Sequence, residues 1–167
     1  MTDNRNVVST PFVLMRMPTD TIPVVAFTKL RSDAIVPTKA TPSSVGFDLY
    51  SCESYTIGQW SSGLIPTGIT AIPPIGCYLR ITGRSGLTLA GFQVQTGTID
   101  IDYTGELKVI MFNATDDVRS FEKGMRIAQI IPETFAVNAI AVEKINVRPG
   151  MEFSTRGNRG FGSSGLF

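Results

Sequence analysis

Residues 63–82 read GLIPTGITAIPPIGCYLRIT, and this stretch decides the fold class. Its apolar residues come in short runs rich in isoleucine and threonine, and glycine or proline separates the runs. An amphipathic helix would place apolar residues every three or four positions and would not tolerate these prolines. We therefore predict one strand over residues 63–72 and another over residues 77–82, with turn residues between them.

Similar short runs recur along the rest of the chain. Further strands are predicted over residues 24–27, 47–51, 97–103, 107–113, 126–132 and 139–145. The one helical turn that we expect is short and covers residues 85–90. With 167 residues, 16 glycines and 10 prolines, the chain fits one all-β domain built as a sandwich, a barrel or a jelly roll.

Composition excludes several classes of function. The absence of histidine excludes a Ser-His-Asp triad and a histidine-ligated zinc, and it leaves a carboxylate as the leading candidate for proton transfer. A net charge of +1 argues against a protein that coats duplex nucleic acid. We expect Cys52 and Cys77 to be small buried thiols rather than a disulfide or a metal site. 

Location is predicted from two absences in the sequence. No apolar run approaches the ~18 residues that cross a bilayer. Residues 1–6 also lack the apolar core of a signal peptide. We therefore expect a soluble intracellular protein, cytoplasmic or nuclear, with no membrane partner.

The two ends of the chain differ from its middle. Residues 1–22 show no clear period, and we interpret them as a partly disordered N-terminal extension to a β domain over residues 23–153. Residues 154–165 read STRGNRGFGSSG, a composition typical of a flexible tail. One aromatic among glycines and arginines is unusual for a linker, however, because Phe161 is suited to stack on a flat ring and Arg156 to meet phosphate.

One internal segment offers a candidate base. Residues 97–105 read GTIDIDYTG, and on a strand Asp100 and Asp102 would share a face. Tyr103 would point to the other face unless a turn intervenes. The plainer interpretation of this segment by itself is a solvated hairpin with two surface acids.

Two other segments have candidate binding groups. Residues 83–86 read GRSG, and an Arg-Ser pair that leads into a short helix suits phosphate, although it also makes an ordinary turn. Gln129 lies between Ile127 and Ile131 on one strand face. Its amide therefore needs a hydrogen-bond partner, which is either a ligand or, as in many cores, another protein group.

Taken in order, five segments resemble the motifs of the trimeric dUTP pyrophosphatases, or dUTPases. They are VGFDLYS at 45–51, RSG at 84–86, GTIDIDY at 97–103, GMRIAQ at 124–129 and RGNRGFGSSG at 156–165. The resemblance extends from about Val24 to Gly165, and five motifs in order are far more specific than one. It implies a jelly-roll-like β-clip with one short helix and a homotrimer of C3 symmetry.

The resemblance also implies an activity. Water would attack the α-phosphorus of dUTP in line and release dUMP and pyrophosphate, with Asp100 at the general-base position. Mg²⁺ would be held through phosphates and water, with no direct ligand from the protein. The implied substrate contacts are Arg84, Ser85, Gly86, Gly97, Ile99, Tyr103, Gln129, Arg156, Phe161, Gly162, Ser163 and Ser164. Structural roles within the motifs fall to Asp48 and Arg126.

Selection of the base and the sugar follows from the same resemblance. Main-chain groups of residues 94–103 would pair with the uracil edge, which cytosine does not match. The backbone near Gly97 would exclude the methyl group of thymine, and Tyr103 would pack under deoxyribose and disfavour UTP. Phe161 would lie over uracil, because residues 154–167 would close as a lid on a neighbouring protomer's site.

Departures from the family pattern leave the proposed base, arginines and aromatic lid in place. Met125 stands where an acidic residue is common, so Arg126 would be held by another group, and Arg159 stands where glycine is common. Two alternatives stay open. A dCTP deaminase of the same fold would need a glutamate that activates water at the base. A catalytically weak, dUTPase-derived interaction or signalling protein would use the sequence outside the motifs.

Overall fold

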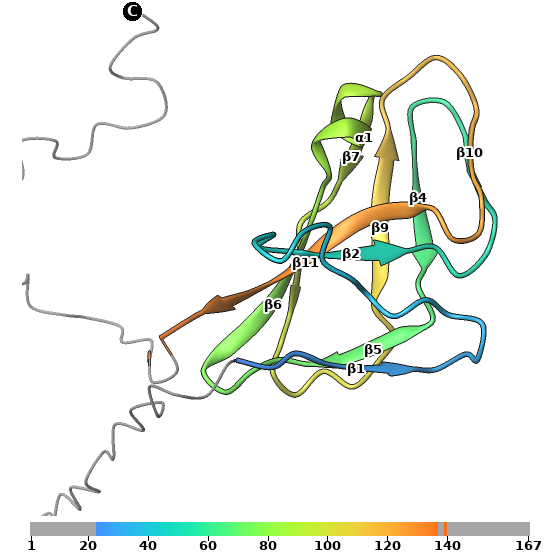
Figure 1. Ribbon diagram of the computed structural model, residues 1–167. Coiled ribbons are helices and arrows are strands. Elements are labelled where there is room, and N and C mark those ends of the chain that lie inside the picture. Colours follow the sequence, from blue (N-terminus) through green and yellow to red (C-terminus); the bar gives the residue numbers. More distant parts are fainter. Residues whose placement is uncertain (1–22, 137–138, 140–167) are drawn as a thin grey trace, which may run out of the picture. The chain divides into compact units, whose positions relative to one another are not determined.

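The computed structural model describes residues 23–136 and residue 139, and the structural statements below concern these residues (Figure 1). Its strands are β1 Ala26–Lys29, β2 Phe47–Tyr50, β3 Tyr55–Ile57, β4 Ser61–Pro66, β5 Ile69–Ile72, β6 Cys77–Thr82, β7 Phe92–Val94, β8 Gly97–Ile99, β9 Lys108–Asn113, β10 Arg119–Phe121 and β11 Arg126–Thr134. The helix α1 covers Ser85–Leu89. The prediction of an all-β fold with one short helix is confirmed, and the described residues as far as Phe135 belong to one compact unit.

The described strands pair antiparallel throughout. The largest sheet has the order β2-β11-β6-β8, and the next has the order β4-β9-β7. The pairs β1-β5 and β10-β3 form two small sheets (Figure 1). Neighbours in the large sheet are far apart in the sequence, so the sheet brings the predicted motif segments side by side. Antiparallel sheets with such crossovers are typical of jelly-roll-like folds.

Side chains from all four sheets fill the core. The largest fully buried ones are Leu49, Ile57, Ile65, Ile69, Leu79, Ile81, Leu107, Val109, Met111, Phe121, Ile127 and Ile130. Phe92 and Phe121 meet edge to face with ring centroids 4.9 Å apart. Each buried leucine or isoleucine contributes roughly 1.5–3 kcal/mol, so the alternating strand faces hold the sheets together.

The predicted strand over residues 63–72 is wrong in one respect, because the structure has two strands there. β4 ends at Pro66 and β5 begins at Ile69. Between them, the buried Thr67 hydroxyl donates to the carbonyl of Leu107 at 2.5 Å. Gly68 has φ +66° and its amide donates to a carboxylate oxygen of Glu106 at 2.8 Å. Because both residues turn toward the 106–107 segment, the chain bends where its sequence appears continuous.

Other expected boundaries differ less. The helix was expected over residues 85–90, and Ala90 is its C-cap. The strand expected over residues 97–103 ends at Ile99, because a turn follows it. The strand expected over residues 139–145 lies outside the described residues except for residue 139. Both terminal segments, 1–22 and 154–167, also lie outside them.

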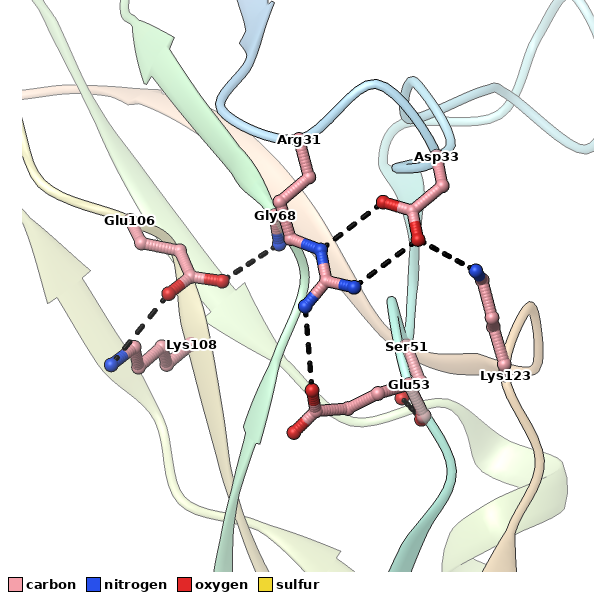
Figure 2. Close-up of polar contacts among 8 residues, drawn as sticks. All are labelled: Arg31, Asp33, Ser51, Glu53, Gly68, Glu106, Lys108 and Lys123. Atoms are coloured by element: carbon pink, nitrogen blue, oxygen red, sulfur yellow. Dashed lines mark hydrogen bonds and ion pairs between the residues drawn. The ribbon is translucent and has the colours of Figure 1, made fainter.

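A surface ion network ties the loop after β1 to two other segments (Figure 2). The Arg31 guanidinium donates to Asp33 at 3.1 Å and to Glu53 at 3.4 Å, and Lys123 Nζ donates to Asp33 at 2.7 Å. The hydrogen bonds that Asp33 accepts from Arg31 and Lys123 lower its pKa well below its usual range. The neighbouring Glu106, which accepts from Gly68, also pairs with Lys108 at 3.6 Å. The network holds surface loops together, and none of these charged residues belongs to a predicted motif.

The β3–β4 turn exposes an aromatic side chain. Trp60 has φ +50° and is 59% exposed. Its indole nitrogen donates to Asp116 at 2.8 Å, and its ring lies 6.4 Å from that of Phe112. Leu64 and Ile110, which are directly opposite each other on β4 and β9, are also about half exposed. This side of the three-stranded sheet is therefore largely apolar and open.

Two smaller predictions concern thiols and the membrane. Both cysteines are free thiols, and Cys52 is buried as expected, whereas Cys77 is only half-buried. Desolvation raises the pKa of Cys52. In the part of the chain that the structure describes, no helix is long and apolar enough to span a bilayer.

Candidate active site

One carboxylate joins two arginines that are far apart in the sequence. Asp48 on β2 is only 8% exposed. Its Oδ1 lies 3.0 Å from Nε of Arg84, and its Oδ2 lies 3.3 Å from Nη1 of Arg126. Arg84 also donates from Nη1 to the carbonyl oxygen of Arg126 at 3.2 Å. We call these three residues the arginine cluster. It joins the first, second and fourth motif segments.

The large sheet explains why these residues meet. β2 and β11 are neighbours, and Asp48 is the register partner of Gln129. The β11 register shifts between Arg126 and Ala128, and such bulges redirect side chains at strand ends. Asp48 therefore serves as the partner of Arg126. The neighbouring Met125 accepts the Glu122 amide at its sulfur, 3.2 Å away.

The Gln129 amide has a protein partner, as the core interpretation of this residue required. Its Nε2 donates to the carbonyl oxygen of Gly83 at 2.8 Å. Gly46 faces it, and a Cβ at Gly46 would lie 2.7 Å from the Gln129 oxygen. Glycine at position 46 thus leaves space for the amide. Gln129 in turn fixes the residue that precedes Arg84.

The second motif forms the start of α1. Arg84 occupies the N-cap position with φ −108° and ψ 134°, and no side chain caps the helix. Ser85 and Gly86 follow in the first turn, where helical N–H groups lack intrahelical acceptors. The guanidinium of Arg84 and the start of α1 thus lie next to each other. This combination suits an anion, and the binding of phosphate here stays a prediction.

The third motif forms a strand end and a tight turn. Gly97 and Ile99 pair with Ile81 and Leu79 of β6. The Tyr103 amide then donates to the Asp100 carbonyl at 3.2 Å, so strand alternation stops before Asp102. The result is a hairpin-like turn that presents Asp100.

The Tyr103 side chain lies close to Gly105, two residues further along the chain. Its hydroxyl donates to the carbonyl of Glu106 at 2.9 Å, and the side chain is about 40% exposed. A Cβ at Gly105 would approach the Tyr103 oxygen to 2.5 Å. Gly105 therefore permits the position of the tyrosine ring.

Asp100 opens onto a pocket of about 490 Å³. Its lining residues are Tyr78, Thr98, Asp100, Ile101, Asp102 and Phe135. The rings of Tyr78 and Phe135 meet nearly perpendicularly, with centroids 6.2 Å apart. The proposed base thus shares this pocket with two aromatic rings and with one other carboxylate, that of Asp102.

A polar network beside this pocket was not predicted from the sequence. Glu133 on β11 accepts from Arg80 Nε at 2.8 Å and from Arg80 Nη2 at 2.5 Å, and from the Tyr78 hydroxyl at 2.5 Å. The two donors lower the pKa of Glu133, and its carboxylate raises the pKa values of Arg80 and Tyr78. The available signal was the alternation of Tyr78 and Arg80 on β6, two polar positions that flank buried Leu79.

The two parts of the candidate site lie at opposite ends of β6. Asp100 follows Ile99, the partner of Leu79, so it lies beside Tyr78. Arg84 lies six residues further along the chain than Tyr78. At the usual rise per strand residue this separates them by about 20 Å. In Figure 1, β6 runs from the lower part of the view toward α1 at the top. One protomer therefore does not place Asp100 beside Arg84.

The described residues offer no ready-made cage for a metal ion. No group of three or more potential metal ligands occurs among them. Mg²⁺ usually keeps several waters and binds substrate phosphates, so the site is compatible with a cation held through phosphates and water. Asp100, which shares its pocket with Asp102, then stays free to act as the base. The predicted tail contacts Arg156, Phe161, Gly162, Ser163 and Ser164 lie outside the described residues.

Comparison with known proteins finds the family that the five motif segments indicate. Residues 32–165 match the family model described as dUTPase. The deoxyuridine 5'-triphosphate nucleotidohydrolase of Saccharomyces cerevisiae is 41% identical over 139 residues, covering 82% of this chain and 92% of that protein. The vaccinia virus protein of the same name is 38% identical over 142 residues, covering 85% and 93%.

Solved structures resemble the fold as well. A dUTPase of Staphylococcus bacteriophage 80alpha, the G164S mutant with dUpNHpp, superposes with a TM-score of 0.74. It is 24% identical and covers 86% of this chain and 99% of its own. A phage phi11 dUTPase mutant, described with a structural Mg(II) ion, has a TM-score of 0.65 at 20% identity and covers 72% and 97%. At these identities the likeness concerns the fold.

Proposed function

Because the chain belongs to the dUTPase family, we propose that it hydrolyses dUTP to dUMP and pyrophosphate. The observation that carries the proposal is the arginine cluster, in which Asp48 aims Arg84 and Arg126 from separate motif segments. The yeast and poxvirus relatives are named for this activity. The phage structure with dUpNHpp, an analogue of the substrate, supports a triphosphate site in this fold.

Phosphate binding is assigned to the end of the sheet beside α1. Arg84 would donate to phosphate oxygens from the guanidinium N–H groups that Asp48 and the Arg126 carbonyl leave free, while Ser85 and Gly86 offer main-chain N–H groups. Gln129 would contact the phosphate chain and keep Gly83 in place. Arg126 would add positive charge beside Arg84, because the shared carboxylate holds both side chains.

Asp100 is assigned the proton transfer. Its carboxylate accepts a proton from a water molecule, whose oxygen attacks the α-phosphorus opposite the bridging oxygen. The bond from the α-phosphorus to that oxygen breaks, and pyrophosphate leaves with the electron pair. Mg²⁺, held through the phosphates and water, would neutralise the charge that develops on the triphosphate.

Assembly would complete the site. About 20 Å separates Asp100 from Arg84 along β6, so we assign the base and the phosphate contacts of one site to different protomers. A homotrimer with three such sites satisfies this requirement by closed symmetry. The third protomer would supply residues 154–167 as a lid, with Phe161 over the base and Arg156 and Ser163 at phosphate.

Selection of uracil and deoxyribose is assigned to the turn that carries Asp100. Main-chain groups near Gly97 and Ile99 would pair with the uracil edge, and cytosine would leave them unpaired. Tyr103 would lie under the sugar where a 2′-hydroxyl would otherwise fit. Its bond to the Glu106 carbonyl and its contact with Gly105 support a fixed position of this ring.

The test is hydrolysis of dUTP, dCTP, dTTP and UTP with Mg²⁺, by the wild-type chain and by Asp100→Asn. We expect selective release of pyrophosphate from dUTP and a loss of roughly 100-fold or more in kcat for the variant, because the base contributes on this order. The variant should still assemble, as judged by light scattering. Ammonia released from dCTP would instead identify a deaminase, and a folded but inactive wild-type trimer would favour an interaction protein.

A further inference from the structure

Tyr78 on β6 lies between two carboxylates, Glu133 on β11 and Asp100 directly after the end of β8. On one side its register partner is Glu133 of β11. On the other side the register Leu79↔Ile99 places Asp100 opposite Tyr78, and both residues line one pocket. Residues at such positions point to the same face of an antiparallel sheet. The sheet therefore presents two acids to the same pair of β6 side chains.

Arg80 is diagonal to both of these acids. It is the register partner of Ile131 on β11 and of Thr98 on β8, so Glu133 and Asp100 are each two residues beyond its direct partners. Diagonal neighbours lie about 7–8 Å apart at Cα, within the reach of an arginine side chain. The geometry that lets Arg80 bind Glu133 thus also lets it bind Asp100. In the structure both guanidinium contacts go to Glu133.

Whether Arg80 pairs with Glu133 or with Asp100 matters because of the charged and titratable groups around Asp100. They are Asp102 on its own turn, Tyr78 and Arg80 on β6, and Glu133 on the far side of β6. Arg80 is the cation in this group. A carboxylate locked to a guanidinium is a weak proton acceptor, because the ion pair favours its charged form. A base at Asp100 works only if Arg80 is held elsewhere.

We propose that Glu133 is a positioning residue that holds Arg80 away from Asp100 and so leaves the Asp100 carboxylate free to accept a proton. Glu133 also accepts the hydrogen bond of the Tyr78 hydroxyl, so this neighbour of Asp100 is engaged on the β11 side of β6. The inference rests on the proposed function, since it assigns a role relative to the base. Arg80 itself takes no part in the reaction.

Four chains test the inference: wild type, Arg80→Met, Glu133→Gln, and the double variant Arg80→Met/Glu133→Gln. Glutamine keeps the shape of Glu133 but binds a guanidinium less strongly than the Asp100 carboxylate does. We expect Glu133→Gln to lose roughly 10- to 100-fold in kcat at neutral pH, and the acid limb of its pH–rate profile to move to lower pH. Arg80→Met should stay within about twofold of wild type, and the double variant should regain most of the lost activity.

A crystal structure of the Glu133→Gln trimer gives a readout that does not depend on turnover. We expect Arg80 nitrogens within about 4 Å of the Asp100 oxygens. An Arg80 side chain that stays with residue 133 overturns the inference. If Arg80 does pair with Asp100 and activity is nevertheless unchanged, the assignment of Asp100 as the base fails instead. If the wild-type chain does not hydrolyse dUTP, the proposed function is refuted. The crystal structure of the Glu133→Gln trimer then still decides whether Glu133 holds Arg80 away from Asp100.

The double variant separates positioning from simple structural support. If it is as slow as Glu133→Gln, the loss comes from the missing carboxylate itself, and the inference is overturned. A large loss in Arg80→Met overturns it too, because Arg80 would then act directly. Thermal unfolding is followed for every chain. Should Glu133→Gln not fold, Glu133→Asp replaces it, since its shorter carboxylate binds Arg80 less well, and rescue by Arg80→Met is again required.

Discussion

Asp48 is the residue on which the arginine cluster depends, because both arginines share its carboxylate. In Asp48→Asn one of the two acceptor oxygens becomes an NH₂ group that faces a guanidinium. We expect kcat/KM for dUTP to fall roughly 10- to 100-fold and stability to fall by about 1–3 kcal/mol. Steady-state kinetics and urea unfolding measure the two effects. Unaltered kinetics in a folded Asp48→Asn chain would remove the cluster from the site.

Asp33→Asn is the matched control for that change. It also removes a carboxylate shared by two cations, Arg31 and Lys123, but in the surface network of Figure 2. Exposed ion pairs contribute little to stability, and this network has no part in the proposed chemistry. Turnover of dUTP should therefore match that of the wild type.

Stability in acid gives Asp33 a second test. Arg31 and Lys123 lower its pKa below the ordinary value of 3.8, so the unfolded chain binds this proton more readily than the folded chain. The stabilisation is then fully present above about pH 4 and is lost as the pH falls below that value. Wild type should exceed Asp33→Asn in urea midpoint at pH 7, and the difference should shrink as the solution is acidified toward about pH 2. A difference that does not vary with pH would contradict this assignment.

At the scale of elements, the break between β4 and β5 depends on Gly68. Alanine there would adopt an unfavourable φ of +66°, and its Cβ would lie 2.9 Å from that of Ala34. Gly76 has a similar φ of +77° with nothing within 4 Å, which makes Gly76→Ala a control. We expect Gly76→Ala to cost about 1 kcal/mol and Gly68→Ala about 1–3 kcal/mol more, as measured by urea unfolding. Equal losses would mean that crowding at Gly68 is relieved by movement of the loop.

The same break shows what sequence patterns predict about elements. Alternation of buried and exposed residues predicted β6 correctly over residues 77–82 and most of β9 and β11, because each has one face in the core. It missed β3, β7 and β10, which are three residues long and too short for any period. The Thr67-Gly68 bend also escaped it, since the cause is a distant contact with Leu107 and Glu106.

The candidate site, like the strands, could be predicted from the sequence only in part. The motif segments located Asp48, Arg84 and Gln129, but only the β2-β11-β6 pairing shows which atoms meet. Glu133 carried no motif signal, and its role depends on register with Tyr78, which local sequence does not specify. Sequence resemblance therefore predicted the parts of the site, and strand register determined their partners.

At the scale of the whole molecule, the separation of Asp100 from Arg84 leads to a mixing experiment. Asp100→Asn and Arg84→Ala should each be nearly inactive alone. Refolded together in equal amounts, they should give a sample with about a quarter of wild-type activity. A site needs its base from one protomer and its arginine from another, so about three quarters of the trimers are mixed and each of these has one working site of its three. Turnover is compared before and after mixing. No recovery in mixed trimers would mean that each site takes both residues from a single chain.

The exposed Trp60 has a practical consequence, because it is the only tryptophan in the sequence. When light excites indole selectively, the emission therefore comes from Trp60 alone. This residue lies in the turn beside the exposed apolar side chains of β4 and β9. In a lone subunit the indole is exposed to water and its emission maximum lies at a longer wavelength. A neighbour that covers this turn would shift the maximum to a shorter wavelength. The fluorescence of Trp60 therefore reports whether subunits associate, and it can be followed on dilution without an added label.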